Sequence, residues 1–535
     1  MAGSNKISDK WVLIVDDMEG MRSQLRMSLT NSGFAKLHLV SSIKEALEKL
    51  AANRYDIILC DYSLGEGTDG QQFLEYLRAN DLIQRNTIFI MITAEQSYAK
   101  VVAASECAPD DYLLKPFTAA QFNIRLEKLL EKQAYFAAID RAADQKNLSR
   151  VISGCDELLA AKDKYFFDLC RIKGGALMRN NQALQAEALY REILALRPLG
   201  WARLGLAHAL AALDRKAEAI ALLRETLAEM PQFMAAYDFL STLIAQSGDK
   251  KAALEVLQQA REIAPGTMSR IREVSSLAVT SGQPELAEKV MREALQKHKY
   301  SPVRKAGDYV VLSQALVDQG KTQDALGVVQ EARKSFSDHD SKVALHTTES
   351  IVHHAAGNET LALAALETAM SAGDPGSLSA DAVVAMADAC FALGKEEDAI
   401  GLLRHTMQNH HEDQAVREKV LASLMAGGKD ASEAGAMIEA SVSEVIQLNN
   451  DGVRKAQAGQ LGEAVELLCE AANRLPSNLQ ILGNAALVMA LDLVNNGKDP
   501  AKLAQCMGYR ESLIRQAPTH PKLEQIDHML KRLAG

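Results

Sequence analysis

The sequence predicts two fold classes in succession, an α/β doubly wound domain built on a five-stranded parallel sheet and then an all-α solenoid. Two observations lead to this prediction. Over residues 11–133, short apolar runs alternate with segments of helical spacing, as strands and helices do in a parallel sheet. From about residue 134 onward the strand signals cease, and alanine and leucine recur at helical spacing. A chain of 535 residues has room for more than one domain.

The elements of the first domain can be placed in order. Helical spacing over residues 18–31 ends near Gly33, and a second helix is expected over residues 42–50. The five expected strands are Trp11–Val15, Leu37–Val40, Asp56–Cys60, Thr87–Ile92 and Asp111–Leu114. Because helical segments separate the strands, we expect a parallel sheet with helices on both faces.

Polar side chains follow four of these strands. Asp16 and Asp17 come directly after the first strand, and Asp61 comes after the third. Thr93 closes the fourth strand, and Lys115 follows the fifth. The carboxyl ends of parallel strands meet at one edge of a sheet, where ligands bind in such folds. Three carboxylates, a hydroxyl and a lysine there suit chemistry on a phosphoryl group held by a metal ion.

This order of strands and motifs, over roughly residues 10–133, resembles the CheY-like receiver domain of bacterial two-component response regulators. The resemblance implies that Asp61 accepts a phosphoryl group from the histidine of a sensor kinase. It also implies that Asp16, Asp17 and Asp61 hold Mg²⁺, helped by the backbone carbonyl of Ser63.

The same resemblance assigns roles around the phosphoryl group. Lys115 pairs with one phosphoryl oxygen, and Thr93 donates its hydroxyl to another. Movement of Thr93 toward the phosphoryl group leaves space for Tyr112, which biases the face formed by helix four, strand five and helix five. Tyr112 as a plain core aromatic is an equal alternative. The peptide between Lys115 and Pro116 matches one that is cis in the family.

The segment after the third strand contains a competing motif. Residues 65–70 formally match GxGxxG, which can bind a dinucleotide. Glu66 and Asp69 would place negative charge against a pyrophosphate, so we interpret this segment as a turn. Two departures from the family pattern are visible, the missing proline after Asp61 and the pair Ala108-Pro109 before the fifth strand.

The second region contains a repeat in which a turn glycine is followed, five positions later, by alanine. Successive glycines are 34, 38, 37, 37 and 65 residues apart, so the last gap indicates one degenerate repeat near residues 412–445. A second small residue follows each alanine after seven positions. The pairs are Gly248/Ala253, Gly282/Ala287, Gly320/Ala325, Gly357/Ala362, Gly394/Ala399 and Gly459/Ala464.

A period near 34 with small residues where two helices cross resembles the tetratricopeptide repeat (TPR). The alternative is a helical solenoid of another kind. The first units are expected at 165–198, 199–231 and 232–265. The expected divisions of the chain are a disordered start at 1–10, a receiver domain at 11–133, a helical connector at 134–164, repeats at 165–521 and a cap helix at 522–535.

Such arrays bind a protein or peptide on a concave face, but no lysine and asparagine clamp for a carboxylate is visible. The histidine pairs at 353–354 and 410–411 point apart on a helix, so we expect surface polar residues there and not a metal site. The candidate concave-face residues by repeat position are Asp168, Arg171, Trp201, His208, Asp238, Thr242 and Arg272.

The junction between the two regions is expected to be helical. Residues 119–144 have the spacing of one long helix, which would run from the receiver into the array without a flexible linker. Phosphorylation at Asp61 would then act mechanically on the array, or would expose a face for homodimer formation.

Composition excludes several classes of protein. No apolar run reaches 18 residues and residues 1–10 are polar, so we expect a cytoplasmic protein that does not enter a membrane. The net charge is −10 and no basic stripe stands out, which argues against nucleic-acid binding and a transcription factor. The seven cysteines form no CxxC pair, which argues against a zinc site.

We therefore expect a response regulator, phosphorylated on Asp61 by a sensor histidine kinase, that regulates protein interactions through its TPR array. One alternative is a modulator of phosphotransfer, or a phosphate sink, that acts on a kinase or a sister regulator. The alternative of another class is an enzyme with an unrecognised site in the helical region. Residues 134–535 show no nucleophile elbow, metal-ligand spacing or paired catalytic carboxylates, so we expect no enzyme there.

Overall fold

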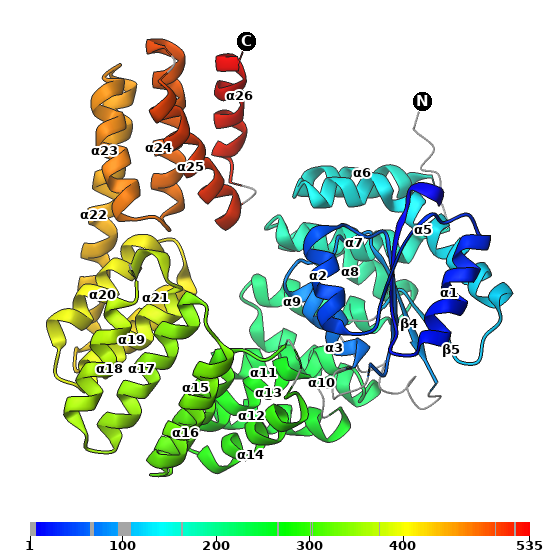
Figure 1. Cartoon of the computed structure of the whole chain (residues 1–535). Helices are drawn as coiled ribbons and strands as arrows, with labels where there is room; N and C mark the ends of the chain where they lie inside the picture. Colours follow the sequence, from blue (N-terminus) through cyan, green and yellow to red (C-terminus); the bar gives the residue numbers. More distant parts are fainter. Residues whose placement is uncertain are drawn as a thin grey trace. The chain divides into compact units, whose positions relative to one another are not determined.

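The computed structural model describes residues 7–64, 69–94, 109–161, 164–264, 267–299, 301, 303–373, 375–497, 499–517 and 520–534. By its internal contacts the chain divides into two compact units, residues 1–304 and 305–535. The first unit holds the α/β domain and the first helices of the array, and the second holds the remaining helices (Figure 1).

The predicted five-stranded parallel sheet is confirmed, with the strand order β2-β1-β3-β4-β5. All four strand pairs are parallel. The three central strands are buried almost end to end, as apolar strands covered on both faces must be. The strands are β1 (Trp11–Val15), β2 (Lys36–Val40), β3 (Ile57–Asp61), β4 (Ile88–Thr93) and β5 (Asp111–Leu114).

Helices cover both faces of the sheet. On one face, side chains of α1 (Glu19–Asn31) and of the long α5 (Ala119–Asp144) pack against alternate strand residues. On the other face, α2 (Ile43–Ala52) and α3 (Gly70–Ala79) pack against the intervening residues. This two-sided core fixes the strands, so the loops at their carboxyl ends stand on a rigid support.

The start of the chain corrects one expectation. Residues 1–10 were expected to be disordered, but Ile7–Asp9 form a 3-10 helix. The Nζ atom of Lys10 lies 2.7 Å from the side-chain oxygen of Gln133 and 3.5 Å from Oδ1 of Asp56. The chain is therefore ordered from residue 7, because these polar contacts tie it to β3 and α5; residues 1–6 lie outside the described residues.

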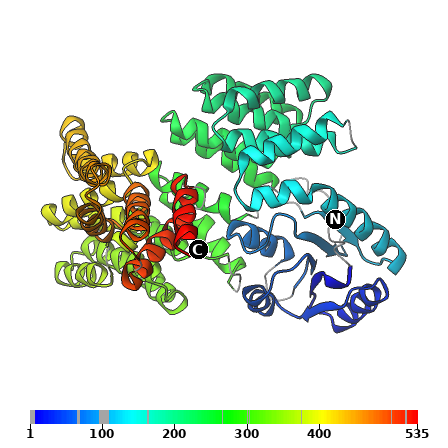
Figure 2. The ribbon, with the colours of Figure 1, turned by 90° about the horizontal axis from the view of Figure 1, so that it is seen from above.

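The all-α region consists of antiparallel helix pairs, which confirms the predicted solenoid class (Figure 2). In the first unit the helices after α5 are α6 (Leu148–Ala160), α7 (Phe166–Arg179), α8 (Ala183–Leu196), α9 (Gly200–Ala212), α10 (Lys216–Glu229), α11 (Met234–Gln246), α12 (Lys250–Ile263), α13 (Met268–Thr280) and α14 (Pro284–Lys297).

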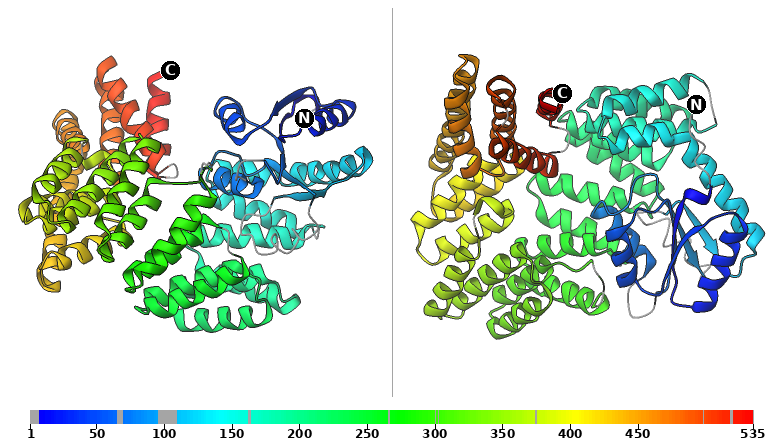
Figure 3. Two further views of the ribbon diagram at one scale, coloured as in Figure 1. Left: turned by 60° about the horizontal axis from the view of Figure 1, so that its bottom comes forward. Right: turned by 45° about the horizontal axis from the view of Figure 1, so that its top comes forward.

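The second unit continues the pairing of neighbouring helices (Figure 3). Its helices are α15 (Ala306–Asp318), α16 (Thr322–Ser335), α17 (His339–Ala355), α18 (Glu359–Ser371), α19 (Ala380–Ala392), α20 (Glu396–Asn409), α21 (Gln414–Ala426), α22 (Ala431–Gln457), α23 (Leu461–Arg474), α24 (Leu479–Asn496), α25 (Pro500–Gln516) and α26 (Lys522–Ala534).

The repeated glycines all end a helix in the left-handed region of backbone conformation. The six glycines found in the sequence have φ between 72° and 93°, a conformation that costs glycine little. Asn181 (φ 56°) and Asp214 (φ 61°) occupy the corresponding turns of the two earlier helix pairs. Asparagine and aspartate tolerate this conformation better than most residues, so these pairs lack the glycine but keep its geometry.

The residues at the helix crossings are small and buried. The six paired alanines are fully buried, at 0% exposure. The second small residues, seven positions later, are also buried, with Thr406 in the place of alanine in one repeat. Short side chains let two helices pack with closely spaced axes. The sequence pattern of small residues therefore marks the contact line between the two helices of each pair.

The 65-residue gap between Gly394 and Gly459 has a structural cause. Helix α22 runs unbroken for 27 residues. It packs against α20 and α21 and also against α23 and α24, so it contacts the helix pairs on both sides. A turn glycine is present before it, at Gly428 (φ 94°), but the alanine spacing that follows the other turns is changed.

Helix α5 joins the sheet domain to the array and spans the range expected from the sequence. Its middle is fastened on both sides. The Gln133 side chain donates to the carbonyl of Asn86 at 2.7 Å, and Lys132 forms a 2.6 Å ion pair with Asp168 of α7. Further along, Asp140 pairs with Arg85 at 3.6 Å. These contacts restrict bending of α5 where it leaves the sheet.

Two expectations from the sequence, that the chain has no membrane span and no zinc site of paired cysteines, concern features that can be examined in the described residues. None of their helices combines the length and the apolar character that crossing a membrane requires. The cysteines among them are free and buried, at positions 60, 155, 170, 390, 469 and 506.

Asp140 provides a stability test of this junction. Burial raises the pKa of Asp140 to about 6, against the opposing effect of Arg85. A carboxyl group whose pKa is raised in the folded state destabilises the fold above that pKa, and this cost decreases as pH falls from about 6 toward the usual pKa of 3.8. Asp140→Asn should therefore raise the unfolding midpoint by about 1–4 °C at pH 7.5 and by less at pH 5.

Thermal unfolding followed by circular dichroism measures this shift. The matched control is Glu157→Gln, an exposed carboxylate on α6. An Asp140→Asn midpoint at or below that of the unchanged chain at pH 7.5 would show that the Arg85 ion pair outweighs the cost of burial.

Candidate phosphoryl-acceptor site

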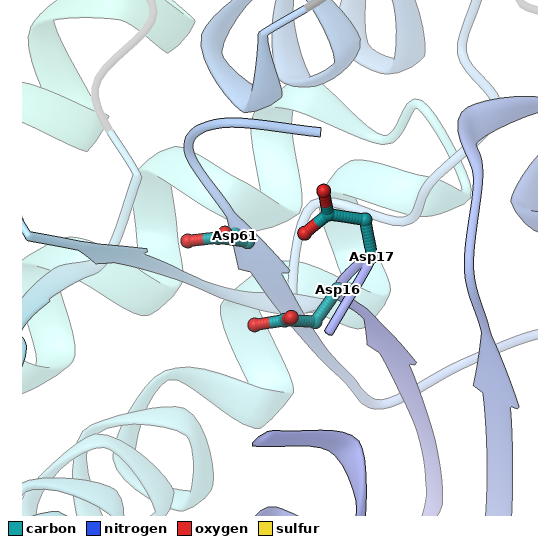
Figure 4. A group of neighbouring side chains, drawn as sticks. All are labelled: Asp16, Asp17 and Asp61. Atoms are coloured by element: carbon teal, nitrogen blue, oxygen red, sulfur yellow. The ribbon is translucent and has the colours of Figure 1, made fainter. Parts of the chain in front are cut away.

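The order of the strands gathers the predicted carboxylates. Strands β1 and β3 are neighbours, and the chain turns to opposite sides of β1 when it forms β2 and β3. Such a point of reversal leaves a crevice at the carboxyl ends of the strands. Asp16, Asp17 and Asp61 meet there, with one ligand atom of each within 4.8 Å of the others (Figure 4).

The two carboxylates after β1 are held differently. Asp16 is fully buried, and its Oδ1 accepts a 2.8 Å hydrogen bond from the backbone N–H of Met18. Asp17 is exposed. The Arg22 guanidinium donates to the backbone carbonyls of both residues, at 2.7 and 3.0 Å. The backbone at this turn is therefore fixed, and Asp17 offers its carboxylate to solvent.

Lys115 reaches across the site to the two buried carboxylates. Its Nζ lies 3.0 Å from Oδ1 of Asp61 and 3.2 Å from Oδ2 of Asp16. Burial opposes the charge on Lys115, but the two carboxylates outweigh it and raise the pKa of the lysine. The backbone N–H of Lys115 donates to the carbonyl of Thr93 at 2.7 Å, and the peptide to Pro116 is cis.

Asp61 ends β3 with 6% of its surface exposed. Burial raises the pKa of Asp61, and the hydrogen bond from Lys115 offsets only part of that effect. The backbone N–H of Tyr62 donates to Oδ1 of Asp61 at 3.0 Å. Two donors, the Lys115 ammonium and the Tyr62 N–H, contact the same oxygen of Asp61, so its other oxygen remains available for chemistry.

The two predicted switch residues lie on neighbouring strands. Thr93 is 2% exposed at the end of β4, and Tyr112 is half-buried in β5. Tyr112 packs against the apolar cluster that includes Phe89 and Met91. The helix-four part of the expected reporting face falls in residues 95–108, outside the described residues.

The loop after the acceptor strand is partly described. Ser63 forms an isolated antiparallel bridge with Asp69, while residues 65–68 of the expected turn lie outside the described residues. The carboxylate of Asp69 accepts from the backbone N–H of Gln72 and caps α3. Within the described part of this segment, Asp69 therefore acts as the N-cap of α3.

Gly70 is a site residue that the sequence analysis missed. A Cβ atom there would lie 2.5 Å from the backbone oxygen of Asp61 and 3.1 Å from Sγ of Cys60. The start of α3 thus touches the backbone of the acceptor strand directly. The glycine itself was visible in the sequence, but only as part of a motif for another ligand.

The donor set fits a hard divalent cation. Mg²⁺ is bound through one or two carboxylates, water and phosphate oxygens. The three carboxylates converge with two of them buried, and Lys115 alone leaves an excess of negative charge among them. Among the described residues this is the one cluster of three or more acidic, histidine or cysteine ligands.

The predicted concave-face residues have varied surroundings. Arg171 and His208 are exposed, and His208 stacks on Phe239 with ring centroids 3.7 Å apart. The other five are engaged with neighbouring groups. Asp168 pairs with Lys132, Trp201 packs edge-on to Tyr190, Asp238 pairs with Arg270, Thr242 donates to the Asp238 carbonyl, and Arg272 donates to the Val303 carbonyl.

The histidine pairs correct a second expectation. All four side chains are half-buried and not simply on the surface. The Nδ1 atom of His411 lies 3.0 Å from Nδ2 of Asn478, and burial lowers the pKa of His410. His410 and His411 directly follow the end of α20, and His353 and His354 lie in the last turn of α17. Their burial depends on tertiary contacts, which helical spacing does not reveal.

Comparison with known proteins identifies the first region. The response regulator receiver domain family matches residues 12–127. Chemotaxis protein CheY-3 of Vibrio cholerae is 30% identical over 121 residues, which cover 23% of this chain and 92% of that protein. Transcriptional regulatory protein SrrA of Staphylococcus aureus is 36% identical over 121 residues, or 48% of its length.

Solved structures match both regions. Chemotaxis response regulator CheY4 of Vibrio cholerae covers 22% of this chain and 98% of its own length, at 25% identity and a TM-score of 0.21. A tetratricopeptide repeat protein of Parabacteroides merdae covers 48% of this chain and 98% of its own, at 12% identity and a TM-score of 0.37. Both TM-scores are low. The description of the array therefore rests on the repeat geometry given above and not on the structural match.

Removal of one carboxylate tests the metal site. Asp16→Asn should weaken Mg²⁺ binding at least about tenfold, because a buried anionic ligand to a hard cation is lost. Calorimetric titration with Mg²⁺ alone measures the affinity, with Glu48→Gln on the exposed side of α2 as the matched control. Equal affinities for Asp16→Asn and the control would place Mg²⁺ elsewhere.

Proposed function

Because the chain belongs to the response regulator receiver family, we propose that Asp61 accepts a phosphoryl group from a sensor histidine kinase and thereby controls protein binding by the helical array. The observation that carries the proposal is the convergence of Asp61 with Asp16, Asp17 and Lys115 at one edge of the sheet. The family match supports the acceptor role, and the array supplies the expected binding surface.

Transfer of the phosphoryl group to Asp61 requires only a few chemical groups. A carboxylate oxygen of Asp61 attacks the phosphorus of the phosphohistidine, and the phosphorus–nitrogen bond breaks with its electron pair left on the imidazole. The product is an acyl phosphate on Asp61. A bound Mg²⁺ would be held by Asp16, Asp17, Asp61 and the Ser63 carbonyl, and would neutralise charge on the phosphoryl oxygens.

Three further side chains act on the phosphorylated state. Lys115 exchanges its contact with Asp61 for one with a phosphoryl oxygen, because its ammonium already lies 3.0 Å from the acceptor. Thr93 donates its hydroxyl to a second oxygen. Tyr112, on the adjacent strand, takes the space that Thr93 leaves. These movements shift the equilibrium between two arrangements of the β4–β5 end of the sheet.

The link to the array is α5. The helix packs on the sheet through Phe122 and Leu126 and on the first array helices through Phe136 and Ile139. A rearrangement at the sheet is therefore carried to the array within one continuous helix. We propose that the array binds a protein or peptide ligand and that phosphorylation changes its affinity.

Phosphorylation can be tested directly. The unchanged chain should take up one phosphoryl group from acetyl phosphate with Mg²⁺, and Asp61→Ala should take up none, because the proposed acceptor carboxylate is removed. Phosphate-affinity electrophoresis measures the product. The matched control is Asp9→Ala, an exposed aspartate outside the site. Normal labelling of Asp61→Ala would contradict the assignment.

A separate experiment tests whether α5 couples phosphorylation of the receiver domain to partner binding by the array. A glycine-serine linker inserted after Gln133 should remove the phosphorylation dependence of partner binding, because the helix no longer transmits a rearrangement. Partners captured from lysate are compared with and without beryllofluoride and Mg²⁺. The same linker appended after Gly535 is the control.

Three results can be distinguished. A partner whose retention depends on beryllofluoride only when α5 is intact supports mechanical coupling. The same dependence in the linker variant would contradict it. Identical partner sets in every condition would indicate the alternative of a phosphate sink or a constitutive scaffold.

A further inference from the structure

Packing on the sheet buries one side of helix α3, but residues on its other side are buried as well. Its residues Phe73, Leu74 and Leu77 pack into the core beneath it. The polar side chains of Gln71 and Gln72 are nevertheless only 8% and 7% exposed. An amphipathic helix on a sheet normally leaves its polar side in water, so a second surface covers the outer side of α3.

That second surface belongs to the array within the first compact unit. Arg270 of α13 interacts electrostatically with Glu75 of α3. Lys297, at the end of α14, interacts with Asp69 at the start of α3. Figures 1 and 3 show α3 beside the green helices that include α11 and α13. Two acidic residues of the receiver thus face two basic residues of the array.

The Arg270 side chain is buried in this surface and is held in place by neighbouring groups. It is 3% exposed, and its guanidinium pairs with the Asp238 carboxylate of α11 through two bonds of 2.7 Å. This forked geometry fixes the plane of the guanidinium. Glu273 of the same helix also interacts with it. Glu75 is half-buried, and burial raises its pKa to about 6 against the opposing effect of Gln71 and Arg270.

The start of α3 is fastened to the acceptor strand. The N–H of Gly70 donates to the carbonyl of Tyr62 at 2.8 Å, and Ser63 bridges Asp69. At Gly70 there is no room for a Cβ beside Asp61. A displacement of α3 therefore moves the segment that carries the Ser63 carbonyl and the backbone beside Asp61.

We propose that the array acts on the phosphoryl-acceptor site through α3, with the α11 and α13 surface around Arg270 docking the outer side of α3 and so positioning Ser63 through its bridge to Asp69. Arg270 is then a positioning residue that touches neither metal nor phosphoryl group. This inference rests on the proposed function of Asp61. Because coupling is reciprocal, Mg²⁺ and phosphoryl binding must also tighten the contact.

The test uses three variants of the full chain. Glu75→Arg places a cation against Arg270, so it should separate α3 from the array. Glu75→Gln removes the buried charge but keeps the shape, so docking should persist. Glu48→Arg makes the same charge change on the exposed side of α2, away from the core.

Two readouts are needed. Hydrogen–deuterium exchange of the α3, α11 and α13 amides, measured without metal, reports docking. Mg²⁺ affinity and the rate of phosphorylation by acetyl phosphate report the site. We expect faster exchange in all three helices of Glu75→Arg, with Mg²⁺ affinity and phosphorylation rate both reduced at least threefold. Glu75→Gln and Glu48→Arg should stay within twofold of the unchanged chain in both readouts.

Each contrary outcome overturns the proposal. Unchanged exchange of α11 and α13 in Glu75→Arg would mean that the contact does not hold α3. Faster exchange with unchanged affinity and rate would mean that the contact does not act on the site. Equal effects of Glu48→Arg would assign the change to net charge. An unchanged chain that takes up no phosphoryl group would instead contradict the proposed function, independently of these variants.

Discussion

The ion pairs from Lys115 to Asp16 and Asp61 are the interaction on which the site depends. Two carboxylates are buried side by side at the ends of adjacent strands, and each would be costly to bury alone. One lysine, directly after the end of β5, neutralises part of that charge and fixes both oxygens in position. The remaining negative charge opposes folding, and the same electrostatic imbalance would favour the binding of a divalent cation.

Much of the first domain could be predicted from the sequence, because apolar strands that end in charged residues leave few alternatives for a buried sheet. The contacts around α3 could not. Gln71 and Glu75 look like residues of a solvated helix face, and nothing in the local pattern shows that Arg270, about two hundred positions later, lies opposite. Periodicity indicates which side of a helix is polar but not what covers it.

In the array, too, the local sequence pattern predicts some features, while others depend on tertiary structure. Glycine marks the turns because only the left-handed backbone conformation closes them cheaply, so a search for glycine finds most repeats. It misses the turns at Asn181 and Asp214, where a different residue adopts that conformation. The 65-residue gap between glycines indicates a degenerate repeat, but it does not show that α22 is one unbroken helix of 27 residues.

The unbroken length of α5 has a geometrical consequence. With 26 residues and a rise of about 1.5 Å per residue, the helix is about 39 Å long. A tilt of about 5° at its sheet end would displace its far end by roughly 3 Å if the helix stayed straight. If phosphorylation tilts α5, as we propose, the number of residues in the helix sets how far its other end moves.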